Sequence, residues 1–338
     1  MVETLAELTT LHLGGPAGRV VTASSSDELV SLVAAADAAG EPVLIVGGGS
    51  NLLVGDAGWP GVVVLVRSSD EPVVSGDSIA SVTVPAGSVW DPFVAWTLAQ
   101  GLSGLAALSG IPGSVGATPI QNVGAYGVEV SDFISALTVY DRETRTTSAW
   151  SPSECGFGFR TSAFKHTDRY VILDVTFDLP RSEQAPPIRY LELARRLGVE
   201  PGAVAPSEQV RSVVLELRRS KGMVLDPADH DTWSVGSFFV NPLVAADQVP
   251  EGCPNWDESG QKKLSAAWLI EHAGFSRGYP GAGSSRVSVS TKHTLALTNR
   301  GGATTAELLE LAAEIRAGVE ARFGIRLRPE AHLANVTF

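Results

Sequence analysis

The segment that most constrains the fold of this chain is a glycine-rich run from Gly110 to Gly127. Five glycines recur in it at irregular spacing, which suits neither a regular helix nor a regular strand. Glycine loses much backbone entropy when it folds, so a long ordered segment of this kind usually encloses a ligand. A flexible linker is the alternative, but Ile111, Val115, Ile120 and Tyr126 are too apolar for one. The run therefore predicts an ordered loop around an anionic ligand.

A second glycine-rich loop, from Gly47 to Asn51, follows an apolar run that predicts a buried strand at 43–46. Glycines there let backbone N–H groups approach an anion, and Ser50 adds a hydrogen-bonding side chain. No Gly-Lys-Ser/Thr sequence follows, so the loop is not a P-loop. It also leads into a predicted strand at 52–54 rather than a helix, which excludes a Rossmann fingerprint. An ordinary tight turn remains the alternative.

Length and charge limit the classes of protein that remain. A chain of 338 residues predicts two or three domains. Its net charge of -12 argues against non-specific nucleic-acid binding, which depends on neutralising phosphates. We find no apolar stretch of membrane-spanning length and no signal-peptide pattern, so we expect a cytoplasmic protein. Cys155 and Cys253 form no recognised motif, and the histidines lack metal-ligand spacing, so we expect no metal.

Periodicity and capping residues predict a mixed α+β fold. Ser25 with Glu28 forms a capping box ahead of a helix that Gly40 ends. Thr304 and Glu307 likewise begin a long helix over 305–323. We expect a closing strand from Ile325 onward. The segment 182–207, rich in proline and charge, resembles an insertion or a linking arm.

The two glycine loops, in this order and separation, closely resemble those of the UDP-N-acetylenolpyruvoylglucosamine reductases, the peptidoglycan flavoenzymes called MurB. The resemblance extends over nearly the whole chain through further motifs in family order. These are Thr10–Gly15, Phe157–Ser162, Gly236–Pro242, Lys263–Ile270 and Leu327–Glu330. The arm around Tyr190 resembles the longer subtype of the family, in which a tyrosine folds over the substrate.

The resemblance implies an FAD-binding two-domain core of the vanillyl-alcohol-oxidase/PCMH type and a third α+β domain that binds substrate. The first FAD-binding subdomain is expected over 1–70. The second is expected over 71–225 together with a C-terminal strand at 327–338, and the substrate-binding domain over 226–326. FAD is expected on the two glycine loops, with NADPH as the hydride source. The expected FAD contacts are Gly47, Gly48, Gly49, Ser50, Asn51, Leu52, Ile111, Pro112, Gly113, Ser114, Gly116, Ala117, Thr118, Gln121, Asn122, Gly124, Ala125 and Tyr126.

The family's reaction reduces an enolpyruvyl ether to a lactyl ether in the synthesis of a peptidoglycan precursor for the cell wall. A hydride from reduced FAD reaches the alkene, so an enolate must be stabilised and then protonated. By residue type alone, Arg160 suits a structural ion pair, Ser237 a turn and Glu330 a solvated carboxylate. The motif matches instead imply that Arg160 and Glu330 stabilise the enolate and that Ser237 donates the proton.

The substrate contacts that the resemblance implies are Tyr190, Lys221, Asn241 and His293. Lys221 follows Arg218-Arg219, a basic patch that suits a diphosphate, although an ordinary exposed face is the alternative. Lys292-His293 stands where the longer subtype often has glutamine. Phe159 stands where tyrosine is common, so any hydroxyl contact from that position is lost.

The partners that we expect are therefore NADPH and UDP-N-acetylglucosamine enolpyruvate, with the product UDP-N-acetylmuramate. We expect neither a nucleic-acid partner nor a membrane partner. We expect the protein to be a monomer. Two other hypotheses compete with this reductase. A related flavin oxidase would share the FAD loops but needs no proton donor to an enolate, so Ser237 and Glu330 argue against it. A non-catalytic nucleotide-sugar-binding protein would be colourless and would not be reconstituted with FAD.

Overall fold

The computed structural model describes residues 4–281 and 283–338, and the chain divides into two compact units. Unit 1 comprises Met1–Ala17, Gly49–Trp59 and Ser220–Phe338. Unit 2 comprises Gly18–Gly48 and Pro60–Arg219. Each unit combines helices with mostly antiparallel strands, so the predicted α+β class is confirmed.

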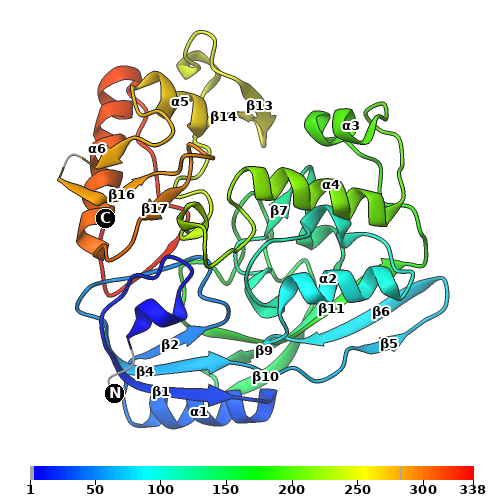
Figure 1. The fold of residues 1–338 in the computed structure, drawn as a ribbon. Helices are drawn as coiled ribbons and strands as arrows, with labels where there is room; N and C mark the ends of the chain where they lie inside the picture. Colours follow the sequence, from blue (N-terminus) through cyan, green and yellow to red (C-terminus); the bar gives the residue numbers. More distant parts are fainter. Residues whose placement is uncertain (1–3, 282) are drawn as a thin grey trace. The chain divides into compact units, whose positions relative to one another are not determined.

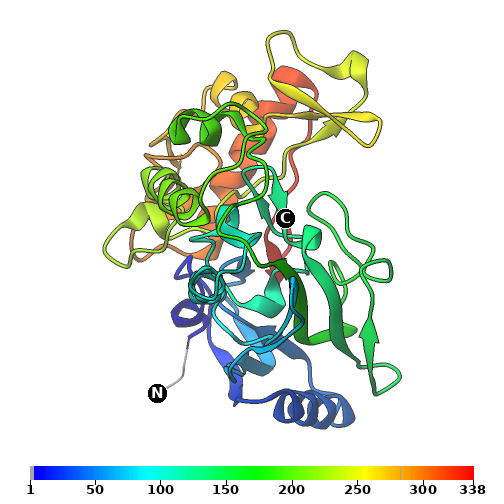
Figure 2. The same ribbon diagram turned by 90° about the vertical axis from the view of Figure 1, so that its right-hand side faces the viewer.

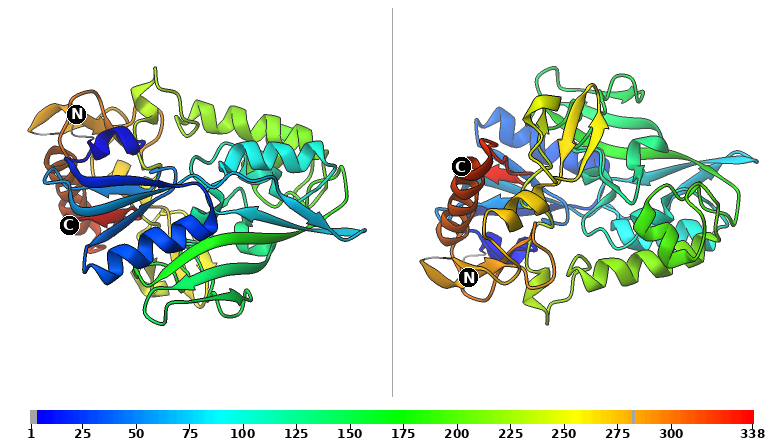
Figure 3. Two further views of the ribbon diagram at one scale, coloured as in Figure 1. Left: turned by 90° about the horizontal axis from the view of Figure 1, so that it is seen from below. Right: turned by 90° about the horizontal axis from the view of Figure 1, so that it is seen from above.

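A three-stranded sheet forms the first layer of unit 2 (Figure 1). Its order is β1-β4-β2, and β2 runs parallel to β4. Helix α1 lies along this layer in the view from below (Figure 3). Its Leu29, Val33 and Ala36 are buried in one core cluster with Val43, Val62 and Val64 of the sheet. The bounds are β1 (Ala17–Ala23), α1 (Ser26–Ala38), β2 (Val43–Val46) and β4 (Trp59–Val66).

The start of α1 matches its predicted cap with one difference. The Ser25 hydroxyl accepts the Glu28 N–H at 3.1 Å, as a capping box requires. The Glu28 carboxylate, however, accepts the N–H of Ser24, at 2.8 Å, and not that of Ser25. Gly40 follows the helix with φ of 67°, in the left-handed region that favours glycine.

A five-stranded antiparallel sheet of order β10-β9-β11-β6-β5 forms the larger layer of unit 2. Helix α2 packs on it, where the rings of Phe93 and Phe177 lie 5.5 Å apart, and α4 and α3 lie farther from the sheet, beyond α2 (Figure 1). The main elements are β5 (Val73–Ser75), β6 (Ile79–Pro85), α2 (Trp90–Ala99), β9 (Ile134–Asp141), β10 (Thr146–Trp150), β11 (Tyr170–Pro180), α3 (Leu191–Leu197) and α4 (Ser207–Ser220). Short elements between them are η2 (Leu105–Leu108), η3 (Val115–Ala117), β7 (Gly124–Ala125), β8 (Val128–Glu129) and η4 (Val130–Asp132).

Unit 1 is built around helix α6, which buries one apolar side against α5 and the sheet β15-β16-β17. A second small sheet of order β12-β14-β13 carries the β13–β14 hairpin, drawn in yellow in Figure 2. The bounds are η1 (Leu5–Leu8), β3 (Leu52–Val54), η5 (His230–Thr232), β12 (Leu243–Val244), η6 (Ala246–Gln248), β13 (Asn255–Glu258), β14 (Gln261–Leu264), α5 (Ala266–His272), β15 (Pro280–Gly281), β16 (Ser284–Val289), β17 (Leu297–Asn299), α6 (Thr305–Phe323) and β18 (His332–Ala334). No helix in the described ranges has the length and apolar character needed to cross a bilayer.

One expectation about secondary structure is wrong. The closing strand begins at His332, where β18 pairs in parallel with β3, and not at Ile325. Ile325 and Leu327 are buried between exposed arginines, so the burial alternates as the sequence suggests while the ladder hydrogen bonds of a strand do not form there. The segment 182–207, expected as an insertion or a linking arm, contains helix α3.

Candidate active site

Within unit 2, the start of the first glycine loop, Gly47 and Gly48, meets the 110–127 run. A Cβ atom added to Gly48 would lie 2.6 Å from the Cα atom of Gly113, which is far inside van der Waals contact. A Cβ atom on Gly47 would lie 2.4 Å from the Ser114 hydroxyl oxygen. Only glycine fits at Gly48, because its backbone lies in direct contact with that of Gly113, whereas at Gly47 the close neighbour is a side-chain hydroxyl. The structure thus joins the parts of the two loops that the sequence analysis expected to share one ligand.

The 110–127 run is held as an ordered loop. The carboxylate of Asp91 accepts the Gly110 N–H at 2.6 Å, and the Trp90 N–H donates to the Gly113 carbonyl at 3.0 Å. Arg211 grips the same carboxylate with two hydrogen bonds of 2.6 and 2.8 Å. Burial opposes ionisation of Asp91, but these hydrogen bonds and the charge of Arg211 outweigh it and lower its pKa. The first half of the run is therefore fixed to α2 and α4.

Asn122 organises the second half of this loop. Its backbone has φ of 46°, in the left-handed region where asparagine is better tolerated than most residues. Its buried amide donates to the Glu129 carboxylate at 2.7 Å and to the Gly158 carbonyl at 3.2 Å. Its side-chain oxygen accepts the Ser131 N–H at 3.1 Å. The Asn122 side chain is thus engaged inside the protein and shapes the loop.

Arg160 lies against this second half. One guanidinium nitrogen donates to the Gly124 carbonyl at 2.6 Å, and another donates to the Asn122 carbonyl at 3.3 Å. The Glu129 carboxylate lies 3.9 Å away. The residue has φ of 52°, and its own carbonyl accepts a hydrogen bond from Lys165 Nζ at 2.9 Å. The structure therefore brings the predicted catalytic arginine together with the predicted cofactor loop, inside unit 2.

Tyr126 and Tyr190 meet edge to face beside this loop, with ring centroids 5.4 Å apart. Tyr190 is 42% exposed, as a residue that covers a ligand needs to be. Burial raises the pKa of Tyr126 to about 12, although the nearby charge of Arg218 opposes the rise. Tyr126 therefore stays a neutral phenol near pH 7.

The sequence analysis placed Arg218 in a basic surface patch, and this is wrong. Arg218 is only 8% exposed, and burial lowers its pKa despite the nearby Tyr126 and Asp91. The signal that could have found this is helical spacing. Arg218 follows the buried Val210 and Val214 by eight and four positions on α4, so it shares their face.

In unit 1, three segments converge on Ser237. The N–H of Phe238 donates to the Leu295 carbonyl at 2.8 Å, and the Phe238 carbonyl accepts the N–H of Glu330 at 2.8 Å. Phe239 forms an antiparallel bridge with Pro329. The strand-like segment that carries Ser237 therefore runs between the one that carries His293 and the one that carries Glu330. These three predicted site residues come together.

The segment is rigidly anchored. Phe238 and Phe239 are fully buried, and their rings lie 5.0 Å apart. The ring of Phe338 packs on both, at 6.0 and 6.3 Å. Immediately before Ser237, Gly236 has φ of 74°, and its N–H donates to the Ser234 hydroxyl at 3.1 Å. The buried rings and the turn at Gly236 fix the backbone of this segment. They thereby define the orientation of the partly exposed Ser237.

Asn241 and Lys221, the remaining predicted substrate contacts, also belong to unit 1. The side-chain oxygen of Asn241 accepts the N–H of Ala266 at 3.0 Å, at the start of α5. Its amide nitrogen is the part of the group that is suited to donate to a substrate oxygen. Lys221 precedes Gly222, which turns with φ of 64°.

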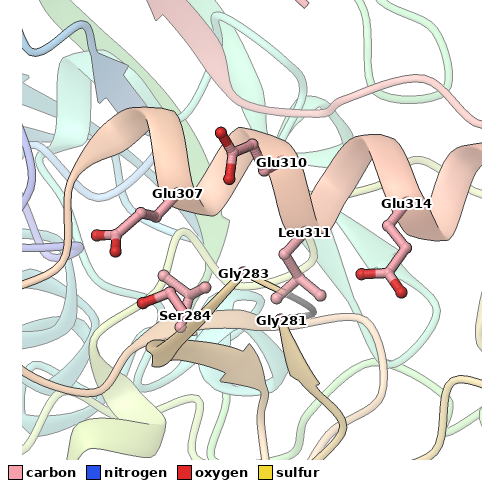
Figure 4. A pocket seen from close by; sticks show the side chains of 8 residues that line it. Gly281, Gly283, Ser284, Glu307, Glu310, Leu311 and Glu314 are labelled. Carbon is pink, nitrogen blue, oxygen red and sulfur yellow. The ribbon is translucent and has the colours of Figure 1, made fainter.

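A separate pocket lies between α6 and β16 (Figure 4). Its volume is about 190 Å³, and Glu307, Glu310 and Glu314 extend along its helical wall. None of the predicted site residues lines it. Across residues 4–281 and 283–338, no group of three or more metal-ligating side chains is arranged to hold a metal ion.

Two family models match the chain. The model described as "FAD binding domain" matches residues 17–148, which include both glycine loops. The model described as "UDP-N-acetylenolpyruvoylglucosamine reductase, C-terminal domain" matches residues 226–334, which include Ser237, Asn241, His293 and Glu330.

Full-length relatives agree with these models. The chain is 55% identical to UDP-N-acetylenolpyruvoylglucosamine reductase of Thermobifida fusca, over 98% of this chain and 97% of that protein. It is 53% identical to the same enzyme of Cutibacterium acnes, over 98% of this chain and 89% of that one. The solved structure of MurB from Thermus caldophilus matches with a TM-score of 0.67 at 25% identity, over 99% of both chains. The chain therefore belongs to the UDP-N-acetylenolpyruvoylglucosamine reductase family and is an FAD-dependent oxidoreductase.

Proposed function

We propose that this protein uses NADPH to reduce UDP-N-acetylglucosamine enolpyruvate to UDP-N-acetylmuramate. The observation that carries the proposal is the convergence of the segments of Ser237, Glu330 and His293 in a chain of this family. The product is a peptidoglycan precursor, and we propose that the enzyme acts in the cytoplasm. We also propose that it is a monomer and that its substrates are small molecules. The expected three-domain division, with 226–326 as the substrate-binding domain, is part of this proposal.

The glycine loops suit FAD, because Gly48 and Gly113 bring the two backbones together at a contact that no Cβ atom would allow. We propose that residues of the loops 47–52 and 111–126 hold the cofactor, with the backbone around Gly47, Gly113 and Ser114 at the pyrophosphate. Glycine-lined backbone of this kind allows N–H groups to approach an anion closely. When bound, FAD supplies the chemistry of accepting a hydride from NADPH and passing it to the alkene of the substrate.

The side chains of the protein have the two remaining tasks. Hydride addition to the terminal alkene carbon leaves negative charge that spreads into the neighbouring carboxylate of the substrate. Arg160, together with Glu330, stabilises this enolate, and a donor aimed at developing charge is typically worth about 3 kcal/mol. The Ser237 hydroxyl then gives its proton to the other alkene carbon, so one hydride and one proton are added across the double bond. Its fixed orientation between two paired segments supports this role.

Substrate binding is divided among the remaining residues. Lys221 provides positive charge for the diphosphate, and Asn241 and His293 provide hydrogen bonds. Tyr190, exposed on its arm, closes over the ligand. The pKa of Lys292 is raised by its hydrogen bond with Asp229, and this ion pair, at 2.5 Å, already balances its charge. We therefore propose His293, and not Lys292, as the ligand contact of this loop.

The decisive experiment follows the absorbance of NADPH with and without the UDP-enolpyruvyl sugar. The purified, flavin-loaded protein should oxidise NADPH rapidly only when the sugar is present, and it should form the lactyl ether in equal amount. Oxidation that needs oxygen and no sugar would indicate a flavin oxidase. A colourless protein that cannot be reconstituted with FAD would indicate a binding protein without catalysis.

Replacing Gly48 with alanine should weaken FAD binding by about tenfold or more, because the new methyl group would force apart the backbones of the two loops. Flavin content after purification and an FAD titration by fluorescence quenching measure this. Gly40→Ala is the matched control in unit 2, since a Cβ atom there meets nothing within 4 Å. It should cost about 1 kcal/mol of stability through its positive φ and leave FAD affinity unchanged. Equal FAD affinity in the two variants would contradict the proposed contact between loop and cofactor.

A further inference from the structure

Asp231, in η5 of unit 1, is a buried carboxylate with an unusual number of donors. It is 3% exposed. Its oxygens accept the Thr291 N–H at 2.9 Å, the Thr291 hydroxyl at 2.5 Å, the Ser290 hydroxyl at 3.1 Å and the Arg300 guanidinium at 2.8 Å. Burial alone would raise the pKa of Asp231, but the hydrogen bonds from Thr291 and Ser290 and the charge of Arg300 lower it. The group is therefore an anion near pH 7.

Through Ser290, this anion controls the loop that carries His293. The Ser290 hydroxyl accepts the N–H of Lys292 at 3.1 Å and the N–H of His293 at 3.2 Å. A hydroxyl has one proton and two lone pairs. With both lone pairs engaged by the loop, its proton points to Asp231, which can only accept. The carboxylate thus fixes the direction of the Ser290 hydroxyl, and the hydroxyl fixes the two amides.

The same residue also touches the segment of Lys221. A Cβ atom on Gly222 would lie 3.0 Å from the Asp231 carbonyl oxygen and 3.2 Å from the Asp231 Cβ atom. Gly222 therefore packs closely on Asp231 immediately after the lysine. Leu295 follows His293 by two residues, and its carbonyl accepts the N–H of Phe238, the residue after Ser237. Asp231 is thus the residue at which the segments of Lys221 and His293 meet.

We propose that Asp231 is a positioning residue that presets the substrate-binding face of unit 1 by holding Lys221 and His293 in register. This proposal rests on the proposed function for the identity of the ligand. A charged group is an expensive way to fill a buried space, since an apolar residue of similar size often gives equal or greater stability. A fully satisfied polar network instead gives a single geometry, which a binding site needs before its ligand arrives.

The test compares Asp231→Asn with Asp56→Asn. Asparagine keeps the size of Asp231 but loses the charge and one acceptor. Asp56 is a matched control in unit 1, because its carboxylate accepts the backbone N–H groups of Thr305 and Ala306 at the start of α6, at 2.7 and 2.9 Å, and neither donor belongs to the 290–293 loop. Both variants should lose stability. Only Asp231→Asn should raise KM for the UDP-enolpyruvyl sugar and Kd for UDP by about tenfold, the loss expected for a hydrogen bond to a charged group.

Hydrogen exchange gives a readout that does not depend on the substrate. The amides of residues 291–293 should exchange faster in Asp231→Asn than in Asp56→Asn at equal global stability. Reduction of FAD by NADPH should be the same in both variants. KM, Kd and loop exchange that match the control would overturn the proposal and leave Asp231 as a residue for folding alone.

Two further outcomes remain decisive. If Asp231→Asn does not fold, Ser290→Ala removes the bridging hydroxyl and keeps the carboxylate, and it should reproduce the rise in KM and in loop exchange. Unchanged values in Ser290→Ala would overturn the proposal. If the unmodified protein neither binds UDP nor oxidises NADPH with the sugar, the proposed function has failed. The exchange measurement then decides by itself whether Asp231 positions the loop.

Discussion

Ser237→Ala should leave the reduction of bound FAD by NADPH nearly unchanged and slow its reoxidation by the UDP-enolpyruvyl sugar by roughly 10²- to 10⁴-fold, the range for loss of a positioned proton donor. The two half-reactions separate because a proton at the substrate carbon is needed only in the second. Stopped-flow absorbance of the flavin, recorded for each half-reaction in turn, measures both rates.

Ser265→Ala is the control for this experiment. Its hydroxyl accepts the Trp268 N–H at 3.2 Å and caps α5 in the same unit, so its removal should cost about 1 kcal/mol of stability. It should leave both half-reactions intact. If Ser237→Ala slows both half-reactions equally, or behaves like Ser265→Ala, then Ser237 serves only the turn that follows Gly236, with its φ of 74°.

Local signals in the sequence predicted the elements whose ends carry their own caps. Helix α6 begins and ends where Thr304, Glu307 and Gly324 indicate, because both reciprocal cap hydrogen bonds form and Gly324 adopts φ of 67°. The glycine run was predicted as an ordered loop for a similar reason, since its apolar residues need burial whatever their partners are. Such predictions depend on residues close together in the chain.

The structure adds what distant partners determine. Asp231 lies in a polar stretch with no periodicity, and its donors Ser290 and Thr291 come sixty residues later. The expected strand at Ile325 failed for a related reason. Alternating burial sets which side chains point inward, but a ladder needs a partner strand, and beyond the single bridge between Pro329 and Phe239 the ladder with β3 begins only at His332.

Motif matching predicted Ser237 and Glu330 as site residues, but it could not show how they are held. The proximity of their segments depends on the backbone pairing of Phe238 with Glu330 and of Val240 with Arg328, and on the buried rings beside it. The same holds for Arg160, for which the sequence left two roles open. Its contacts with Gly124 and Asn122 show that it braces the glycine loop, and the proposed enolate-stabilising role would be a second use for the same guanidinium.

Arg160→Lys separates these two roles. Lysine keeps the charge but cannot reproduce the planar fork that grips a carboxylate or two carbonyls at once. We expect kcat for reduction of the sugar, expressed per bound flavin, to fall by roughly 10²- to 10³-fold, as when one preorganised donor is lost. The FAD affinity should fall much less, because Asp91 and Trp90 still hold the first half of the loop. Steady-state turnover and an FAD titration on the same preparation measure the two effects.

Arg142→Lys is the matched control, since Arg142 also forms a two-pronged contact in unit 2, with Asp37 at 2.6 and 3.1 Å. It should lose about 1 kcal/mol of stability and keep its turnover per flavin. The quantity to compare between the two variants is therefore the turnover per bound flavin. If Arg160→Lys loses FAD in proportion to its activity and the flavin that remains turns over normally, the arginine is a brace for the Gly124 carbonyl and the enolate needs another cation. If turnover per flavin falls sharply while FAD stays bound, the Arg160 guanidinium acts on the substrate. A residue that only braced the loop would change the fraction of enzyme loaded with FAD and not the turnover of the loaded enzyme.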